Sequence, residues 1–155
     1  MNLDDFEEVK LLGEKYYKSL NDIYSPYFKE SVKFNTQALE HLKFKKRGKA
    51  RLEQDQYMRF KLLHLAPVII ELSRTLQGVW RTKRFESMKI NSKWQQMLMH
   101  VTYYEFIALI KRDRVKIIVK QIENGEFFFW SIIPYWGMNE GTRTRLFHEG
   151  IPEED

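Results

Sequence analysis

The sequence contains no cysteine among its 155 residues, and its 7 glycines are scattered. Without cysteine there is no disulfide framework and no thiolate metal site. No glycine-rich loop of the kind that cradles nucleotide phosphates is present. The 4 histidines show no helical spacing suited to metal ligands. We therefore expect no metal, no cofactor, and neither redox nor ATP-driven chemistry.

Long apolar runs are also lacking. A membrane-spanning helix needs roughly 20 apolar residues, and no stretch approaches that length. The chain opens with acidic residues, where a secretory signal would be basic and then apolar. We therefore expect no membrane partner and a cytoplasmic location.

The composition that remains is typical of one folded domain, because 43% of the residues are hydrophobic and 30% are charged. A chain of this length buries one core and is too short for two. We divide it into a helical segment at 1–30 that packs on the same core, an α+β core at 31–136, and a tail at 137–155.

Positive charge gathers in the middle of the chain. The net charge is +5 although both ends are acidic. Eight cations lie between positions 43 and 61, opposed by two carboxylates, and further basic runs occupy 81–84 and 111–120. This distribution predicts a polyanionic partner. The alternative is that these runs are ordinary solvated faces.

The first part of the chain has helical periodicity. Apolar residues spaced by three and four predict a helix over 3–23, closed by Pro26. A short extended piece at 32–34 leads to Asn35, a good N-cap for a brief helix that carries His41.

A longer helix is predicted over 53–75, with Pro67 expected to kink or split it near Ala66. Aromatic and β-branched residues then take over and predict a four-stranded, mostly antiparallel sheet. The expected strands are 79–89, 101–110, 115–122 and 127–133. Helices followed by a meander indicate an α+β fold.

The last two strands should form a hairpin, because Asn124-Gly125 between strand patterns favours a two-residue type I′ turn. Cross-strand partners would then sum to 249. One face would carry Lys116, Ile118, Lys120, Phe129 and Ser131. The core face would carry Val115, Ile117, Val119, Phe128, Trp130 and Ile132. Two ammonium groups, a hydroxyl and a ring on the first face would suit a phosphate and a stacked base, although Lys and Ser also occur on wetted sheet faces.

The order of elements and several short motifs resemble the phage- and mobile-element-associated branch of the barnase, EndoU, colicin and RelE-like ribonucleases. The resemblance covers about residues 32 to 136. Its motifs are Phe34 to Leu42, the basic loop from Lys43 to Arg51, Pro67 to Ile70, Tyr104 to Phe106, Val115 to Val119, and Phe128 to Pro134. In that branch a short helix presents a His, basic residues follow, and the final strand carries a Ser or Thr. Here His41, the basic loop and Ser131 hold these places, and a second His beside the loop is lacking.

The resemblance implies metal-independent endoribonuclease activity, in which the 2′-hydroxyl of RNA attacks the adjacent phosphate. It implies catalytic roles for His41 as base or acid, for Arg51 and Lys116 as cations that stabilise the charge on phosphorus, and for Ser131 as a hydrogen-bond donor. The implied nucleic-acid-binding residues are Lys43, Lys45, Lys46, Arg47, Lys120 and Phe129. The implied partners are RNA, including tRNA or mRNA, and an inhibitory protein, as expected for a toxin-like or mobile-element effector.

A non-catalytic module that binds nucleic acid or an acidic protein through the same basic surface is the alternative. On that reading His41 is a packed or solvated residue. The two hypotheses differ in one geometric respect, because catalysis requires His41 and Ser131 to share a groove.

Overall fold

The computed structural model describes residues 3–46, 48–135 and 151–155, with only the main chain of Leu3 and Lys46. The helices are α1 (Leu3–Ser19), α2 (Thr36–Lys43), α3 (Glu53–Leu62) and α4 (Leu65–Leu72). The strands are β1 (Ile23–Ser25), β2 (Glu30–Lys33), β3 (Phe44–Lys46), β4 (Lys49–Ala50), β5 (Gly78–Ile90), β6 (Lys93–Ile110), β7 (Asp113–Ile122) and β8 (Phe127–Pro134). The predicted α+β class is confirmed. In the part of the chain that the structure describes, no helix is long and apolar enough to cross a membrane.

The sheet is larger than predicted and is mixed. Its six strands run in the order β1-β2-β8-β7-β6-β5, and β3 and β4 form a separate small ribbon. The expectation of four strands was wrong because β1 and β2 were not counted. They are three and four residues long, too short to show an alternating pattern, and β2 joins the sheet by parallel pairing of Val32 with Phe127. That pairing spans almost a hundred positions of sequence and leaves no local signal.

The helices largely follow the sequence signals. Asn35 caps α2 as predicted, since its side-chain Oδ1 accepts a hydrogen bond from the N–H of Ala38 at 3.0 Å. The long helix is split as predicted, and the break lies at 63–64, two residues before Ala66. Pro67 is the third residue of α4, where a missing N–H costs no intrahelical hydrogen bond, so the helix restarts just before it.

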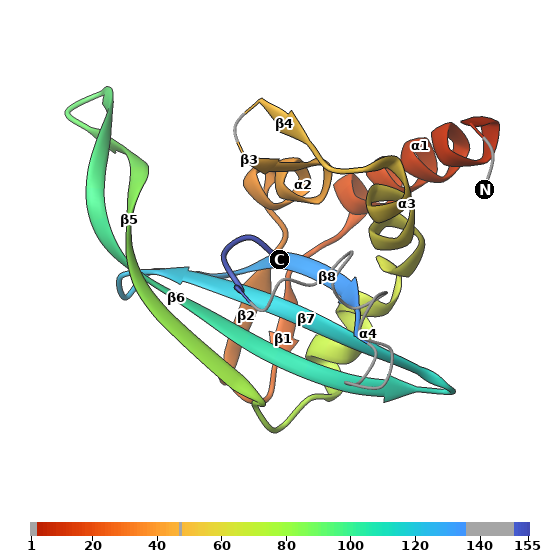
Figure 1. Cartoon of the computed structure of the whole chain (residues 1–155). Coiled ribbons are helices and arrows are strands. Elements are labelled where there is room, and N and C mark those ends of the chain that lie inside the picture. The colour runs from red at the N-terminus through yellow and green to blue at the C-terminus, as the bar shows by residue number, and fades with distance from the viewer. Residues whose placement is uncertain (1–2, 47, 136–150) are drawn as a thin grey trace.

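A long β5–β6 hairpin extends beyond the body of the molecule (Figure 1). Residues 93–100, which lie outside the predicted strands, also belong to β6. The two strands pair one to one from Gly78 with Glu105 to Ile90 with Lys93. Both turn residues, Asn91 and Ser92, have positive φ, as a primed two-residue turn requires.

The turn between β7 and β8 differs from the prediction. The N–H of Gly125 donates to the oxygen of Ile122 at 2.9 Å, so Glu123 and Asn124 are the central residues. The positive φ of 52° falls on Glu123, and Gly125 has none. The predicted Asn124-Gly125 turn was therefore placed one residue late.

The register is confirmed on one side of a β-bulge and shifted on the other. Ile118 pairs with Ser131 as predicted, but Val119 pairs with Phe129 and Lys120 with Phe128. Trp130 is the extra residue. Because a bulge lets two successive side chains share a face, Trp130 joins Ser131.

The bulge also turns Phe129 to the other face. Phe129 is fully buried and stacks on Phe34 at a centroid distance of 5.3 Å, with Tyr17 of α1 beside it. Its predicted position beside Ser131 was therefore wrong. Trp130 is buried in the core as predicted, but on the sheet face opposite to the one predicted. Helices α2 and α3 contact β8 (Figure 1) and carry residues of the candidate functional site.

Candidate functional site

His41 lies in the last turn of α2 and faces β8. Residues at three- and four-residue spacing share one helical face, so Ala38 and Leu42 are buried with it. The imidazole stacks on the indole of Trp130, with ring centroids 3.9 Å apart and planes inclined by 19°. The β8 bulge thus supplies the surface on which His41 rests.

Arg51, between β4 and α3, binds His41 in two ways. Its Nε donates to the main-chain oxygen of His41 at 2.8 Å, and its Nη2 lies 3.0 Å from the imidazole Nε2. The same Nη2 lies 3.5 Å from Nδ1, and because a guanidinium has only donors, Nε2 is the nearer acceptor when Arg51 donates to the ring. His41 and Arg51, ten positions apart, therefore form one buried unit.

A second arginine joins this unit through a shared carboxylate. Asp55 contacts Arg51 at 3.5 Å and Arg59 at 2.5 Å, each four residues away on the chain. Arg59 is fully buried, and its Nη1 donates to the hydroxyl of Ser131 at 2.5 Å. Asp55 thus holds two guanidinium groups together, and Arg59 connects them to the final strand.

Burial and neighbouring cations keep His41 neutral. Removal from water lowers the pKa of His41 well below its usual value, and Arg51 and Arg59 lower it further. Burial, with a smaller contribution from Arg59, lowers the pKa of Arg51 to about 9, which leaves it cationic at neutral pH. The site therefore combines an uncharged imidazole with a cationic arginine pair.

Of the two sheet lysines predicted for the site, one adjoins it. The ammonium of Lys120 lies 4.1 Å from the Trp130 ring centroid and 2.8 Å from the carboxylate of Glu86. Burial lowers the pKa of Lys120, although Glu86 opposes this effect. Lys116 instead pairs with Glu105 of β6 at 2.5 Å. The carboxylate partner of Lys116 thus lies on β6, and the ammonium of Lys116 is also 5.1 Å from the ring centroid of Tyr135.

The cluster is covered by residues 151–155. The main-chain oxygen of Glu154 accepts from Arg51 at 2.8 Å. That of Asp155 accepts from Ser131 at 2.7 Å and also from Arg59. The indole N–H of Trp130 donates to the oxygen of residue 153 at 3.3 Å. At these positions the hydrogen-bond donors of the site bind electron-rich oxygen atoms.

A cavity of about 530 Å³ adjoins the covered cluster. His41 and Trp130 form part of its wall, with Arg84 and Glu153 on the side of the sheet. Arg84 and Glu153 pair at 3.0 Å, which attaches segment 151–155 to β5. The cavity therefore opens beside the imidazole and is bordered by the covering segment.

The basic loop contributes less than predicted. Lys43 pairs with Glu14 at 3.3 Å and with Glu40 at 3.2 Å, so it connects α2 to α1. Lys45 lines the cavity. The side chain of Lys46 and the whole of Arg47 lie outside the described residues.

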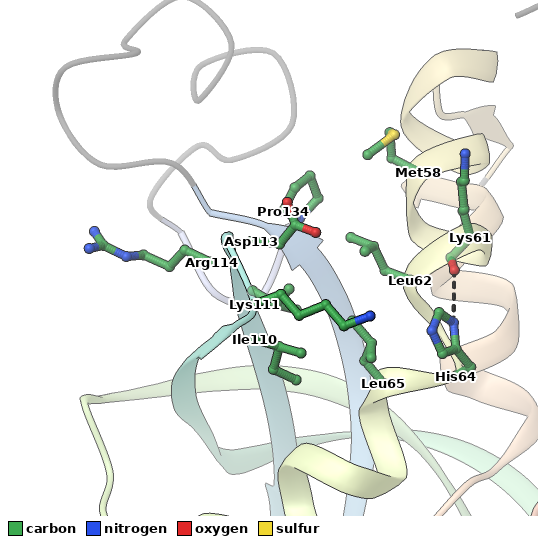
Figure 2. Close-up of a pocket in the computed structure, with 11 residues that line it drawn as sticks. Met58, Lys61, Leu62, His64, Leu65, Ile110, Lys111, Asp113, Arg114 and Pro134 are labelled. Carbon is green, nitrogen blue, oxygen red and sulfur yellow. Dashed lines mark hydrogen bonds between the residues drawn. The ribbon is translucent and has the colours of Figure 1, made fainter.

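Another cavity, of about 340 Å³, lies between the α3–α4 corner and the β6–β7 turn (Figure 2). Its His64 has its Nδ1 3.0 Å from the main-chain oxygen of Lys61, and Leu62 and Leu65 supply apolar wall. None of the four predicted catalytic residues lines it. Three of them, His41, Arg51 and Ser131, belong to the His41 cluster instead.

Three residues of the cluster were not predicted as site residues, namely Asp55, Arg59 and Trp130. The four-residue spacing of Asp55 and Arg59 was a readable signal, because residues at this spacing share one face of a helix. Trp130 had no such signal, since strict alternation placed it on the opposite face of the sheet and the bulge reverses that face.

The described residues contain no group of three or more His, Cys, Asp or Glu side chains placed to hold a metal ion. Comparison of the chain with protein-family models, with curated proteins and with solved structures found no match.

Proposed function

We propose that this protein is a metal-independent endoribonuclease that cleaves RNA through attack of the 2′-hydroxyl on the adjacent phosphate. One observation carries the proposal. The donors of Arg51, Arg59 and Ser131 converge on two main-chain oxygens next to the imidazole of His41. These oxygens stand in for the non-bridging oxygens of a phosphate.

The proposed chemistry assigns a role to each group. The proton of the 2′-hydroxyl passes to Nε2 of His41, which carries none in the tautomer protonated at Nδ1. The O2′–P bond forms and the P–O5′ bond breaks, and the leaving oxygen takes a proton from the imidazolium or from water. Arg51 and Arg59 stabilise the extra negative charge on phosphorus, and Ser131 donates to one of its oxygens. In the covered state the Arg51 guanidinium lies against Nε2 of His41. Binding of the substrate must therefore move this guanidinium from Nε2 to the phosphate.

Cleavage of RNA in the presence of EDTA tests the proposal. We expect products with a 2′,3′-cyclic phosphate end, and no cleavage where the 2′-hydroxyl is replaced by hydrogen. His41→Ala should lower the rate by roughly 100- to 10,000-fold, the usual size of general acid–base catalysis. His64→Ala, at an exposed histidine outside the cluster, is the matched control and should cleave at the wild-type rate.

The assay includes a chain that lacks residues 151–155, because these residues cover the donors. Equal cleavage by wild type and His41→Ala would refute the role of His41. If neither the full chain nor the uncovered chain cleaves structured or unstructured RNA, the proposal is wrong.

A non-catalytic anion-binding module is the second candidate, and one observation favours it. Asp55 pairs with both arginines while Nε2 of His41 accepts from Arg51, so the network is internally satisfied without a reacting group. Under this alternative, His41→Ala would change the binding of RNA and no product would form.

A further inference from the structure

One face of the β5–β6 hairpin is exposed, basic and aromatic. Successive side chains of a strand alternate between faces, so the one-to-one register places the five pairs from Arg81–Thr102 to Lys89–Trp94 on this face. From β5 it takes Arg81, Lys83, Phe85, Ser87 and Lys89, and from β6 it takes Trp94, Gln96, Leu98, His100 and Thr102. None of the ten is acidic. We call this set the arm face.

Its apolar side chains are open to solvent. Trp94 is 70% exposed, Phe85 is 67% exposed, and Leu98, which pairs directly with Phe85, is 56% exposed. Large exposed rings on a projecting element mark interaction sites, because burial of such area stabilises a complex. The fold of the chain therefore leaves these rings available to a partner.

The charges of the arm face point to one kind of partner. Arg81, Lys83 and Lys89 are exposed, and in the part of the chain that the structure describes they form no ion pair with a carboxylate. The carboxylate of Glu86 is on the opposite face, paired with Lys120. The cations thus flank the rings without neutralisation, and a hollow of about 240 Å³ is lined by Arg81, Lys83 and His100 at the base of the arm.

We propose that the arm face binds single-stranded nucleic acid, with bases stacked on Phe85 and Trp94 and phosphates on Arg81, Lys83 and Lys89. Exposed rings between cations are how single strands are bound without sequence preference, since every base has an aromatic face. The proposal rests on the proposed function only for the choice of nucleic acid as partner. The β5–β6 hairpin (Figure 1) binds the nucleic acid outside the His41 cluster and makes no contribution to the chemical step.

The test measures binding of a labelled single-stranded DNA 20-mer by fluorescence anisotropy at low salt. DNA lacks the 2′-hydroxyl, so the measurement is independent of cleavage. Phe85→Ala with Trp94→Ala should weaken binding roughly tenfold or more, because stacking contributes about 1–3 kcal/mol per base. Leu11→Ala with Leu12→Ala is the control, since it removes exposed apolar area from α1.

The cations are tested separately. Lys83→Gln with Lys89→Gln should lower the slope of log affinity against log salt by about 1.4, because each phosphate contact to a single strand contributes about 0.7. Lys15→Gln with Lys18→Gln, at exposed positions of α1, removes the same charge elsewhere and should leave the slope unchanged. Melting curves establish that each variant is folded.

Three outcomes would overturn the proposal. The first is wild-type affinity in both arm variants, and the second is absence of binding by the wild type at low salt. The third is a dimer in sedimentation that the ring variant abolishes, since this would assign the arm face to a second copy of the chain. Failure of the ribonuclease assay leaves all three results readable, because no arm residue takes part in cleavage.

Discussion

At the scale of single residues, the central feature is an imidazole held without charge among three cations. His41 contacts Arg51, and the pKa of His41 is lowered first by burial and then by Arg51, Arg59 and Lys120. A neutral imidazole has a lone pair that can accept a proton, and the lowered pKa makes this imidazole a weaker base than a solvent-exposed histidine. The same environment has a measurable consequence for stability, because the unfolded chain does not share it.

The first prediction concerns this linkage. Between the lowered folded pKa of His41 and the ordinary value of about 6.5, the unfolded chain binds a proton that the folded chain does not. The free energy of unfolding should therefore fall as pH drops below about 6.5. From pH 7.5 to 5.5 the wild type should lose about 1 kcal/mol more than His41→Gln, measured by urea denaturation.

His64→Gln, at an exposed histidine, should follow the wild type over the same range and controls for the loss of any histidine. Equal losses by wild type and His41→Gln would show that His41 takes up a proton in the folded state as it does when unfolded. Burial among cations would then not describe its environment in solution.

At the scale of elements, segment 151–155 is the part most directly tied to the site. Its main-chain oxygens occupy donors from α3, from β8 and from Arg51, which lies two residues before α3. A phosphate and this segment cannot use the same donors at once. The segment therefore competes with any anion that binds between Arg51 and Arg59.

The second prediction is that removal of residues 151–155 destabilises the protein and creates a site for oxyanions. The four lost hydrogen bonds to main-chain oxygens alone, at about 0.5–1.5 kcal/mol each, should lower the free energy of unfolding by about 2–6 kcal/mol. Sulfate should then raise the melting temperature of the shortened chain more than that of the full chain, because it binds only where the donors are open. Chloride at equal ionic strength is the control.

A point variant of the full chain tests the same competition. Glu153→Arg places two cations together where Glu153 and Arg84 now pair, so it should loosen the segment and show part of the sulfate effect. Equal stabilisation of full and shortened chains by sulfate would mean that the donors are open already, or that they do not bind anions.

At the scale of the whole molecule, charge and shape provide two separate basic regions. One is the covered cluster between α2, α3 and β8, and the other is the arm face of the β5–β6 hairpin. Both would contact phosphates when a nucleic acid binds, and each contact releases condensed counterions.

The third prediction concerns the salt dependence that the phosphate contacts of both regions produce together. Affinity for single-stranded RNA, measured with a non-cleaving His41→Ala protein, should fall by orders of magnitude between about 50 and 200 mM salt if six or more phosphates are contacted. Isothermal titration at several salt concentrations gives the slope. A slope near zero would remove nucleic acid as the partner of both regions.

Some elements of the fold and of the candidate site could be predicted from the sequence, and others could not. Periodicity and the cap at Asn35 located α2, so His41 was placed in a short helix with its basic neighbours following. The pairing of Ile118 with Ser131 also came from the sequence. The rest depended on contacts between distant segments, such as Val32 with Phe127, for which a local pattern carries no information.

The sequence by itself determined the α+β class, the position of the helices ahead of the four long strands, and the cation-rich middle of the chain, because propensity, periodicity and charge act locally. Only the tertiary structure decided which cations share the site. A one-residue bulge at Trp130 brought an indole beneath His41 and sent Phe129 into the core. Because side chains alternate between the two faces of a strand, a shift of one residue moves each side chain to the opposite face. The register itself is fixed by packing across the whole sheet.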